Sequence, residues 1–181
     1  LISPVALAIT GDVSLDATST LSMANGGNII GKVRNAGRML WSNATPGKIL
    51  SITGNYTGVA GSILAMNTVL GNDSSITDKM SVSGDTSGDS AIKITNVGGA
   101  GALTTNGIEV ISVSGNSAGS FSLASPVQAG AYQYLLQKGT ASGANTNNWY
   151  LVSTITTPPV TPPVTPPVTP PVTPPVTPPV T

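Results

Sequence analysis

The segments Lys79-Met-Ser-Val-Ser83 and Ala91-Ile-Lys-Ile-Thr95 flank a polar turn that begins at Gly84-Asp85. Both alternate polar with apolar residues, and this period of two predicts a β-strand with one buried face. The preceding segment Ser62-Ile-Leu-Ala-Met66 follows the same rule. The side chains expected to point into the core are those of Leu64, Met66, Met80, Val82, Ile92 and Ile94.

The rest of residues 1–156 repeats this pattern of short strands and polar turns. Asn-Gly, Gly-Asn and Gly-Asp pairs separate the strands, and these residues favour tight turns. No apolar pattern with the period of an α-helix is present with caps at its ends. The sequence therefore predicts an all-β protein. The further alternating segments are 49–53, 108–113, 120–123, 132–136 and 149–152.

A sandwich, a closed barrel and a solenoid all accommodate short alternating strands. Three features favour a parallel β-solenoid. Charged residues make up only 8% of the chain, which suits stacked rungs that bury most of their length. Asn and Gly recur at turns, where a left-handed residue lets a rung change direction. The aromatic residues, 4 Tyr, 2 Trp and 1 Phe, are few for a sandwich core, whereas a solenoid rung packs only on its neighbours.

The two ends of the chain differ from its middle. From Thr157 the sequence repeats Thr-Pro-Pro-Val and ends at Thr181. Proline fixes φ, lacks an amide donor and favours extended geometry in the residue before it. We therefore expect an extended polyproline tail over 157–181 that acts as a spacer, with a PxxP ligand as the alternative. Residues 1–9 are mildly apolar without a preceding Lys or Arg, so we interpret the chain as an internal piece without a signal peptide.

Composition restricts the chemistry that this chain can perform. It contains no His and no Cys, and its 7 Lys and Arg balance its 7 Asp and Glu. Nucleophiles activated by His and metal sites built on thiolate or imidazole are thereby excluded. The balanced charge lacks the basic footprint of a nucleic-acid-binding protein. We predict no enzymatic activity, no cofactor, no nucleic-acid partner, and no catalytic or metal-binding residue.

Two clusters of charged residues, one acidic and one basic, each allow more than one functional interpretation. The densest acidic group is interpreted as turn chemistry, with a calcium site or a cleft for carbohydrate cleavage as less favoured interpretations. A basic group near the start of the chain is interpreted as a solvated face, with attraction to an anionic glycan or lipopolysaccharide as the alternative. The acidic residues are Asp73, Asp78, Asp85 and Asp89. The basic residues are Lys32, Arg34, Arg38 and Lys48.

Most of the large aromatic residues lie just before the proline-rich tail. The end of a solenoid exposes a strand edge and an apolar cross-section, and a terminal cap must cover both. Large rings bury more area per residue than Val or Ile, so we expect them to form this cap. An aromatic platform for sugar binding is the alternative. The residues concerned are Tyr132, Tyr134, Trp149 and Tyr150.

Residues 31–153 contain ordered segments that resemble the C-terminal end of the passenger in pertactin-like and AIDA-type autotransporters. The most specific is Val82-Ser-Gly-Asp-Thr-Ser-Gly88, and Thr105-Asn-Gly107 and Asn148-Trp-Tyr-Leu151 mark the last part. The remaining segments that carry the resemblance are 45–50, 54–58, 64–71, 72–78, 94–101, 108–111, 115–119 and 130–134.

This resemblance implies a right-handed parallel β-helix whose last rungs form an autochaperone region. It divides the chain into β-helix rungs over 1–104, a cap over 105–156 and the linker over 157–181. The residues expected to form the folding cap are Gly107, Tyr132, Tyr134, Trp149, Tyr150 and Leu151.

The implied function is that of a structural stalk and folding nucleus in a passenger at the bacterial cell surface, or secreted, and associated with virulence or adhesion. The alternative is an adhesin surface that itself binds a host glycan or protein. The implied partner is an outer-membrane β-barrel translocator. The chain ends at Thr181 without such a barrel, so we interpret it as a fragment or the product of a truncated frame.

Overall fold

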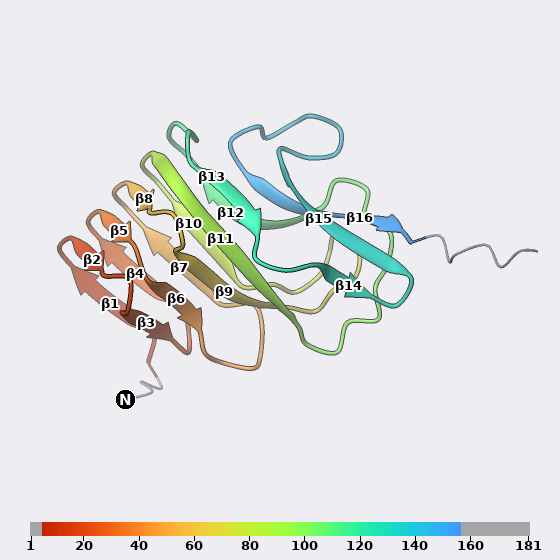
Figure 1. Cartoon of the computed structure of the whole chain (residues 1–181), viewed down its shortest axis with the longest axis horizontal. Coiled ribbons are helices and arrows are strands. Elements are labelled where there is room, and N and C mark those ends of the chain that lie inside the picture. The colour runs from red at the N-terminus through yellow and green to blue at the C-terminus, as the bar shows by residue number, and fades with distance from the viewer. Residues whose placement is uncertain (1–4, 157–181) are drawn as a thin grey trace, which may run out of the picture.

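The computed structural model describes residues 5–156 as an all-β fold without a helix (Figure 1). The predicted tail over 157–181 lies outside the described residues. Within this part of the chain, no helix is long and apolar enough to cross a membrane. The strands are β1 Leu7–Thr10, β2 Val13–Leu15, β3 Thr20–Met23, β4 Gly27–Ile30, β5 Val33–Asn35, β6 Arg38–Trp41, β7 Ile49–Ile52, β8 Tyr56–Gly58, β9 Ile63–Thr68, β10 Lys79–Val82, β11 Thr86–Asn96, β12 Ile108–Val113, β13 Ser120–Leu123, β14 Val127–Ala129, β15 Tyr132–Lys138 and β16 Trp149–Ile155.

Parallel strands stack on three faces of a solenoid. The first face consists of β1, β4, β7, β10 and β12, and the second of β2, β5, β8 and the start of β11. The third consists of β3, β6, β9, the end of β11, and β13. Strand β11 is 11 residues long and turns the corner between the second and third faces. The first three turns each contribute one strand to each face, and in the fourth turn β11 serves both the second and the third face. This stacking confirms the predicted parallel β-helix.

The core is a stack of aliphatic and methionine side chains inside the three faces, as the period of two predicts. Five of the six side chains expected to point inward are fully buried, and Ile94 is half-buried against the core. The difference at Ile94 has a simple cause. Strand β13 pairs with β11 only as far as Leu123 opposite Ile92, so the next rung does not cover Ile94.

A ladder of glycines forms the corner between the first and second faces. The amide of Gly54 donates to the carbonyl of Gly31, that of Gly84 to Gly54, and that of Gly115 to Gly84, at 3.0, 3.2 and 3.2 Å. A Cβ on Gly54 would lie 2.5 Å from the Gly31 oxygen, and one on Gly84 would lie 2.7 Å from the Gly54 oxygen. Only glycine permits rungs to approach this closely, so the ladder fixes the register of the stack.

A polar network lies inside the corner between the second and third faces. The Tyr56 hydroxyl is 2.8 Å from Ser90 Oγ and accepts from Asn35 Nδ2 at 3.1 Å, and Ser90 Oγ lies 2.7 Å from Ser62 Oγ. All four side chains are buried. Because the hydroxyls and the amide satisfy one another, the solenoid interior tolerates them at its turns. Burial raises the pKa of Tyr56, so its phenol stays neutral and can donate.

The last three strands leave the β-helix pattern. Strand β16 pairs antiparallel with β12, β15 with β16, and β14 with β15, so the first face ends in an antiparallel extension. Figure 1 shows this extension at the opposite end of the molecule from β1, β2 and β3. The parallel β-helix therefore ends before β14, and the chain continues in antiparallel strands. The hairpins do not close a barrel or a sandwich. They extend one face.

Candidate functional site: the C-terminal cap

A carboxylate on β12 joins the antiparallel strands to the parallel stack. Glu109 forms an ion pair with Lys79 on β10, the preceding rung. Its Oε2 accepts from the Tyr150 hydroxyl at 2.7 Å and from Asn148 Nδ2 at 2.9 Å. Asn148 also accepts from the amide of Val113 through its Oδ1, at 2.9 Å. The cap is thus attached to β12 by polar side chains as well as by backbone pairing.

The electrostatics of this cluster hold Glu109 in its charged form. Partial burial opposes ionisation, but the hydrogen bonds from Lys79, Tyr150 and Asn148 and the charge of Lys79 outweigh it, so the pKa of Glu109 is lowered. Burial and the bond to Glu109 raise the pKa of Tyr150. The phenol therefore remains a donor to a carboxylate over the physiological pH range, and this is a charge-assisted hydrogen bond.

Tyr134 on β15 anchors the cap to two loops of the stack. Its ring is fully buried, and its hydroxyl donates to the Gly71 carbonyl at 2.8 Å and accepts from the Ala102 amide at 3.1 Å. Gly71 lies in the loop after β9 and Ala102 in the loop after β11. One side chain therefore satisfies backbone groups from two successive rungs.

The other residues predicted to form the cap have different surroundings. Leu151 is fully buried and Tyr150 is 5% exposed, whereas Trp149 and Tyr132 are half-buried. Trp149 meets Phe121 edge to face with ring centroids 5.4 Å apart, and Phe121 stacks in turn on Tyr56 at 6.1 Å. These rings form a continuous apolar path from the cap into the solenoid core.

Gly107 lies where the loop after β11 passes β16. Its φ is +109°, a conformation that L side chains rarely adopt, and an added Cβ would lie 2.9 Å from the Cβ of Tyr150. Glycine therefore allows the loop to pass close to β16.

The same loop is held by a carboxylate from the preceding rung. The two Asp73 oxygens accept from the amides of Thr105, Asn106 and Gly107 at 2.8, 2.9 and 3.1 Å. Desolvation raises the pKa of Asp73, but these three backbone donors outweigh it, and the net pKa is lowered. Asp73 thus attaches the start of β12 to the loop after β9.

Asp78 serves a similar role inside the protein. It is fully buried and accepts from the amides of Lys48 and Asn67 at 2.9 Å each, and from Asn67 Nδ2 at 3.1 Å. Asn67 Nδ2 also donates to the carbonyls of Trp41 and Asn43, both at 2.9 Å. Burial raises the pKa of Asp78 in spite of these donors.

The structure separates both groups of charged residues that the sequence analysis singled out. Asp85 Oδ1 accepts from the amide of Asn116 on the next rung at 2.7 Å, and Asp73 and Asp78 bind the segments described above. The interpretation as local turn chemistry is therefore wrong for Asp73 and Asp85, because their partners lie in the next rung. Asp78 combines both roles, since it binds Asn67 across its own loop and Lys48 before β7. Within residues 5–156, no three acidic residues gather as metal ligands.

The four basic residues are also dispersed. Lys32 and Arg34 lie on the outer side of the second face, Arg38 on β6 of the third, and Lys48 before β7 of the first. Sequence reasoning missed Glu109, Asp73 and Phe121 as cap residues. The only signal available for Glu109 was that it is the single Glu of the chain.

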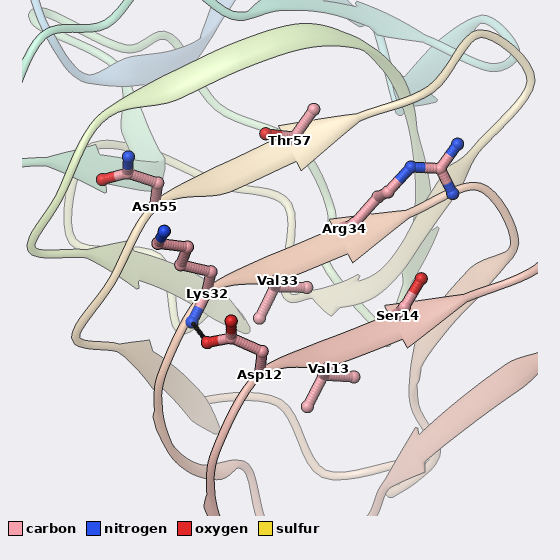
Figure 2. A pocket seen from close by; sticks show the side chains of 8 residues that line it. All are labelled: Asp12, Val13, Ser14, Lys32, Val33, Arg34, Asn55 and Thr57. Carbon is pink, nitrogen blue, oxygen red and sulfur yellow. Dashed lines mark hydrogen bonds between the residues drawn. The ribbon is translucent and has the colours of Figure 1, made fainter.

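The outer side of the second face carries a groove of about 370 Å³ (Figure 2). In this view Ser14, Arg34 and Thr57 extend from β2, β5 and β8 on the side opposite to Val13 and Val33. Asp12, Lys32 and Asn55 lie at the starts of the same strands. The backbone amide of Lys32 donates to Asp12 Oδ1 at 2.8 Å.

The model of the family described as Autochaperone Domain Type 1 matches residues 8–136. The chain therefore belongs to this family of autochaperone domains.

Curated relatives agree with this assignment. Over 111 residues the chain is 48% identical to the autotransporter adhesin AIDA-I of Escherichia coli, covering 61% of this chain and 9% of that protein. Over 117 residues it is 44% identical to the adhesin BmaC autotransporter of Brucella suis biovar 1 (strain 1330), covering 60% of this chain and 3% of that protein. Over 133 residues it is 50% identical to the uncharacterized protein YuaQ of Escherichia coli (strain K12), covering 73% and 10%.

The chain thus spans a tenth or less of the length of these three relatives. It is an autochaperone region of an autotransporter passenger, and such a passenger is surface-exposed or secreted and derives from an outer-membrane precursor. The family and the adhesin relatives point to a structural, non-enzymatic role.

Proposed function

We propose that this chain is the structural stalk and the folding nucleus of a passenger associated with adhesion or virulence, and that its parent protein carries an outer-membrane β-barrel translocator. The autochaperone family and the two adhesin relatives support the passenger role. The finer assignment, in which the cap folds first and directs the rest, rests on the geometry of the two ends.

The observation that carries the proposal is the difference between these ends. At one end, β14, β15 and β16 extend the first face in antiparallel order and are fastened by Glu109 and Tyr134. At the other end of residues 5–156, β1, β2 and β3 are the edges of the three faces (Figure 1). The apolar residues there, Leu7, Ile9, Val13 and Leu21, are only partly buried.

The open end can accept a further parallel rung, because its strand edges offer backbone donors and acceptors in register. The closed end cannot add a parallel rung to its first face, where β16 already pairs with β12. Growth of the stack is therefore directed toward the N-terminus. In an array where each rung packs on its neighbours, a stable cap lowers the cost of ordering the next rung. Folding outside the membrane would oppose back-sliding without a nucleotide.

Hydrogen exchange on the isolated chain tests where folding starts. We expect backbone amides in residues 105–153 to be better protected than those in 12–60, because the cap is the more stable unit. Greater protection of 12–60 would contradict the autochaperone assignment and leave only a β-helix segment.

Two matched variants sharpen this test. Tyr150→Ala removes a buried ring from the cap, and Trp41→Ala removes a buried ring from the second rung. Each should cost about 3–5 kcal/mol of unfolding free energy if the rung cannot collapse around the cavity. We expect Tyr150→Ala to abolish protection along the whole chain and Trp41→Ala to spare residues 105–153. In a barrel-bearing parent, only Tyr150→Ala should leave the full passenger protease-sensitive at the surface.

A further inference from the structure

The groove on the second face has no part in the folding contacts of the cap. The strands below it are in strict register, with Val13 opposite Val33 and Val33 opposite Tyr56. Since side chains alternate along a strand, the residues next to these inward ones face outward. They form a row across three strands, with Arg34 between Ser14 and Thr57 (Figure 2).

The charges in this groove are available to a ligand. Lys32 and Arg34 are exposed, and among residues 5–156 the only ion pair joins Lys79 to Glu109. The one carboxylate in the lining, Asp12, already accepts from the Lys32 amide through Oδ1. The Oδ1 atom of Asn55 accepts from the Asp85 amide at 2.9 Å. The NH₂ group of Asn55 is not used in this bond and can donate to a ligand.

The lining also restricts the class of ligand. It contains no aromatic residue on which a nucleic-acid base could stack, and its two valines point inward. A protein partner would need large apolar or aromatic anchors at the centre of the contact, and no such side chain lines this groove. Hydroxyls, a carboxamide, a carboxylate and two cations are instead the groups that hydrogen-bond a polar, hydroxyl-rich molecule with an acidic substituent.

We propose that this groove binds an acidic saccharide. The Arg34 guanidinium pairs with the carboxylate, sulfate or phosphate of the sugar in a forked geometry, and Lys32 adds a second positive charge. The hydroxyls of Ser14 and Thr57 and the amide of Asn55 bind ring hydroxyls. Neighbouring strands lie about 4.8 Å apart, so an oligosaccharide lying across them meets a new set of polar groups at each strand.

This binding site goes beyond the proposed folding function. Its residues lie on β2, β5 and β8 and at their starts, away from β12 and β14–β16. Loss of saccharide binding would therefore leave the hydrogen-exchange pattern unchanged, and a failed folding test would leave the groove intact.

Calorimetric titration of the full chain tests the proposal with four probes: a heparin hexasaccharide, hexagalacturonate, the lipid-free core oligosaccharide of lipopolysaccharide, and maltohexaose as the neutral control. We expect saturable binding of at least one acidic probe, weakened by salt, and at least tenfold weaker binding of maltohexaose. Tighter binding of the first two probes would assign the ligand to host-type acidic glycans. Tighter binding of the third would assign it to the bacterial surface.

The matched variants are Arg34→Gln and Lys93→Gln. Lys93 is an exposed cation on β11 outside the groove, so its substitution removes the same charge. We expect Arg34→Gln to weaken binding at least tenfold and Lys93→Gln to leave it unchanged, with the same melting temperature for both. Absence of saturable binding to every acidic probe, equal binding of maltohexaose, or an equal loss in Lys93→Gln would overturn the proposal.

Discussion

The hydroxyl of Tyr150 donates to Oε2 of Glu109 at 2.7 Å, across the boundary where antiparallel β16 meets the parallel stack at β12. Backbone pairing is irregular at this boundary, because the register shifts between Glu109 and Ile111. The side-chain bond therefore fixes an orientation that the backbone ladder alone specifies less well. Through Lys79, the same carboxylate connects the cap to β10, one rung further into the stack.

Glu109→Gln should destabilise the chain by about 1.5–3 kcal/mol at pH 7, the range for hydrogen bonds to a charged group. The amide keeps the size of the side chain but loses the ion pair with Lys79. Urea unfolding followed by circular dichroism measures the loss. Equal stability of variant and native chain would mean that the cluster contributes nothing to the attachment of the cap.

The contribution of Glu109 should also depend on pH. Its folded pKa is lowered from 4.5, so its stabilisation is complete above that value and is lost as the pH falls toward the folded pKa. As the pH falls from 5 through the lowered pKa of Glu109, the unfolding free energy of the native chain should therefore decrease more than that of Glu109→Gln. Parallel pH profiles for the two proteins would contradict this assignment.

Tyr134→Phe tests the buried anchor of β15. The ring stays in place, but the Gly71 carbonyl and the Ala102 amide each lose a partner, at a cost of about 1–3 kcal/mol. Tyr132→Phe is the matched control, because Tyr132 is half-buried and lies on the same strand. Thermal unfolding should show a clear drop for the first variant and no change for the second. Equal melting temperatures for both variants would refute the anchoring role.

Asp73→Asn tests the loop contact. An amide can accept hydrogen bonds through only one atom, whereas the carboxylate accepts from three backbone amides through two. Because Asp73 is exposed, we expect a modest loss of about 1 kcal/mol at pH 7, with faster exchange of the amides at 105–107. The lowered pKa of Asp73 means that the native chain loses this stabilisation as the pH falls below 3.8. Asp89→Asn, at another exposed position, should change neither the unfolding free energy nor the exchange of the amides at 105–107.

Local patterns were sufficient to predict the strands and the side chains that they bury. The alternation in Lys79–Val82 places Met80 and Val82 at the core because a strand has only two faces. Two of the large rings near the C-terminus, Tyr134 and Tyr150, are buried, and their role in a folding cap stays a prediction. These predictions depend only on neighbours within one strand.

Strand direction and the partners of single charges could not be predicted in the same way. The antiparallel pairing of β16 with β12 joins residues about 40 positions apart, and no local pattern distinguishes it from a further parallel rung. Asp73 and Asp85 each lie in a polar turn and were therefore interpreted as turn residues. Their carboxylates instead accept hydrogen bonds from backbone amides 31 to 34 residues away. The lengths of the intervening loops determine such contacts.

Gly54→Ala should be among the most disruptive single changes outside the cap. Its Cβ would lie 2.5 Å from the Gly31 carbonyl oxygen and 2.7 Å from the carbonyl carbon, and neither backbone atom can move without shifting the rung. Overpacking of this kind typically costs up to about 3 kcal/mol. Gly98→Asn is the control, since Gly98 has a φ of +73° that Asn tolerates and no atom within 4 Å of an added Cβ. We expect urea unfolding to show a large loss for Gly54→Ala and less than about 1 kcal/mol for Gly98→Asn. Equal losses of stability in the two variants would mean that glycine is needed at this corner only for its backbone flexibility. The close approach of successive rungs would then not fix their register.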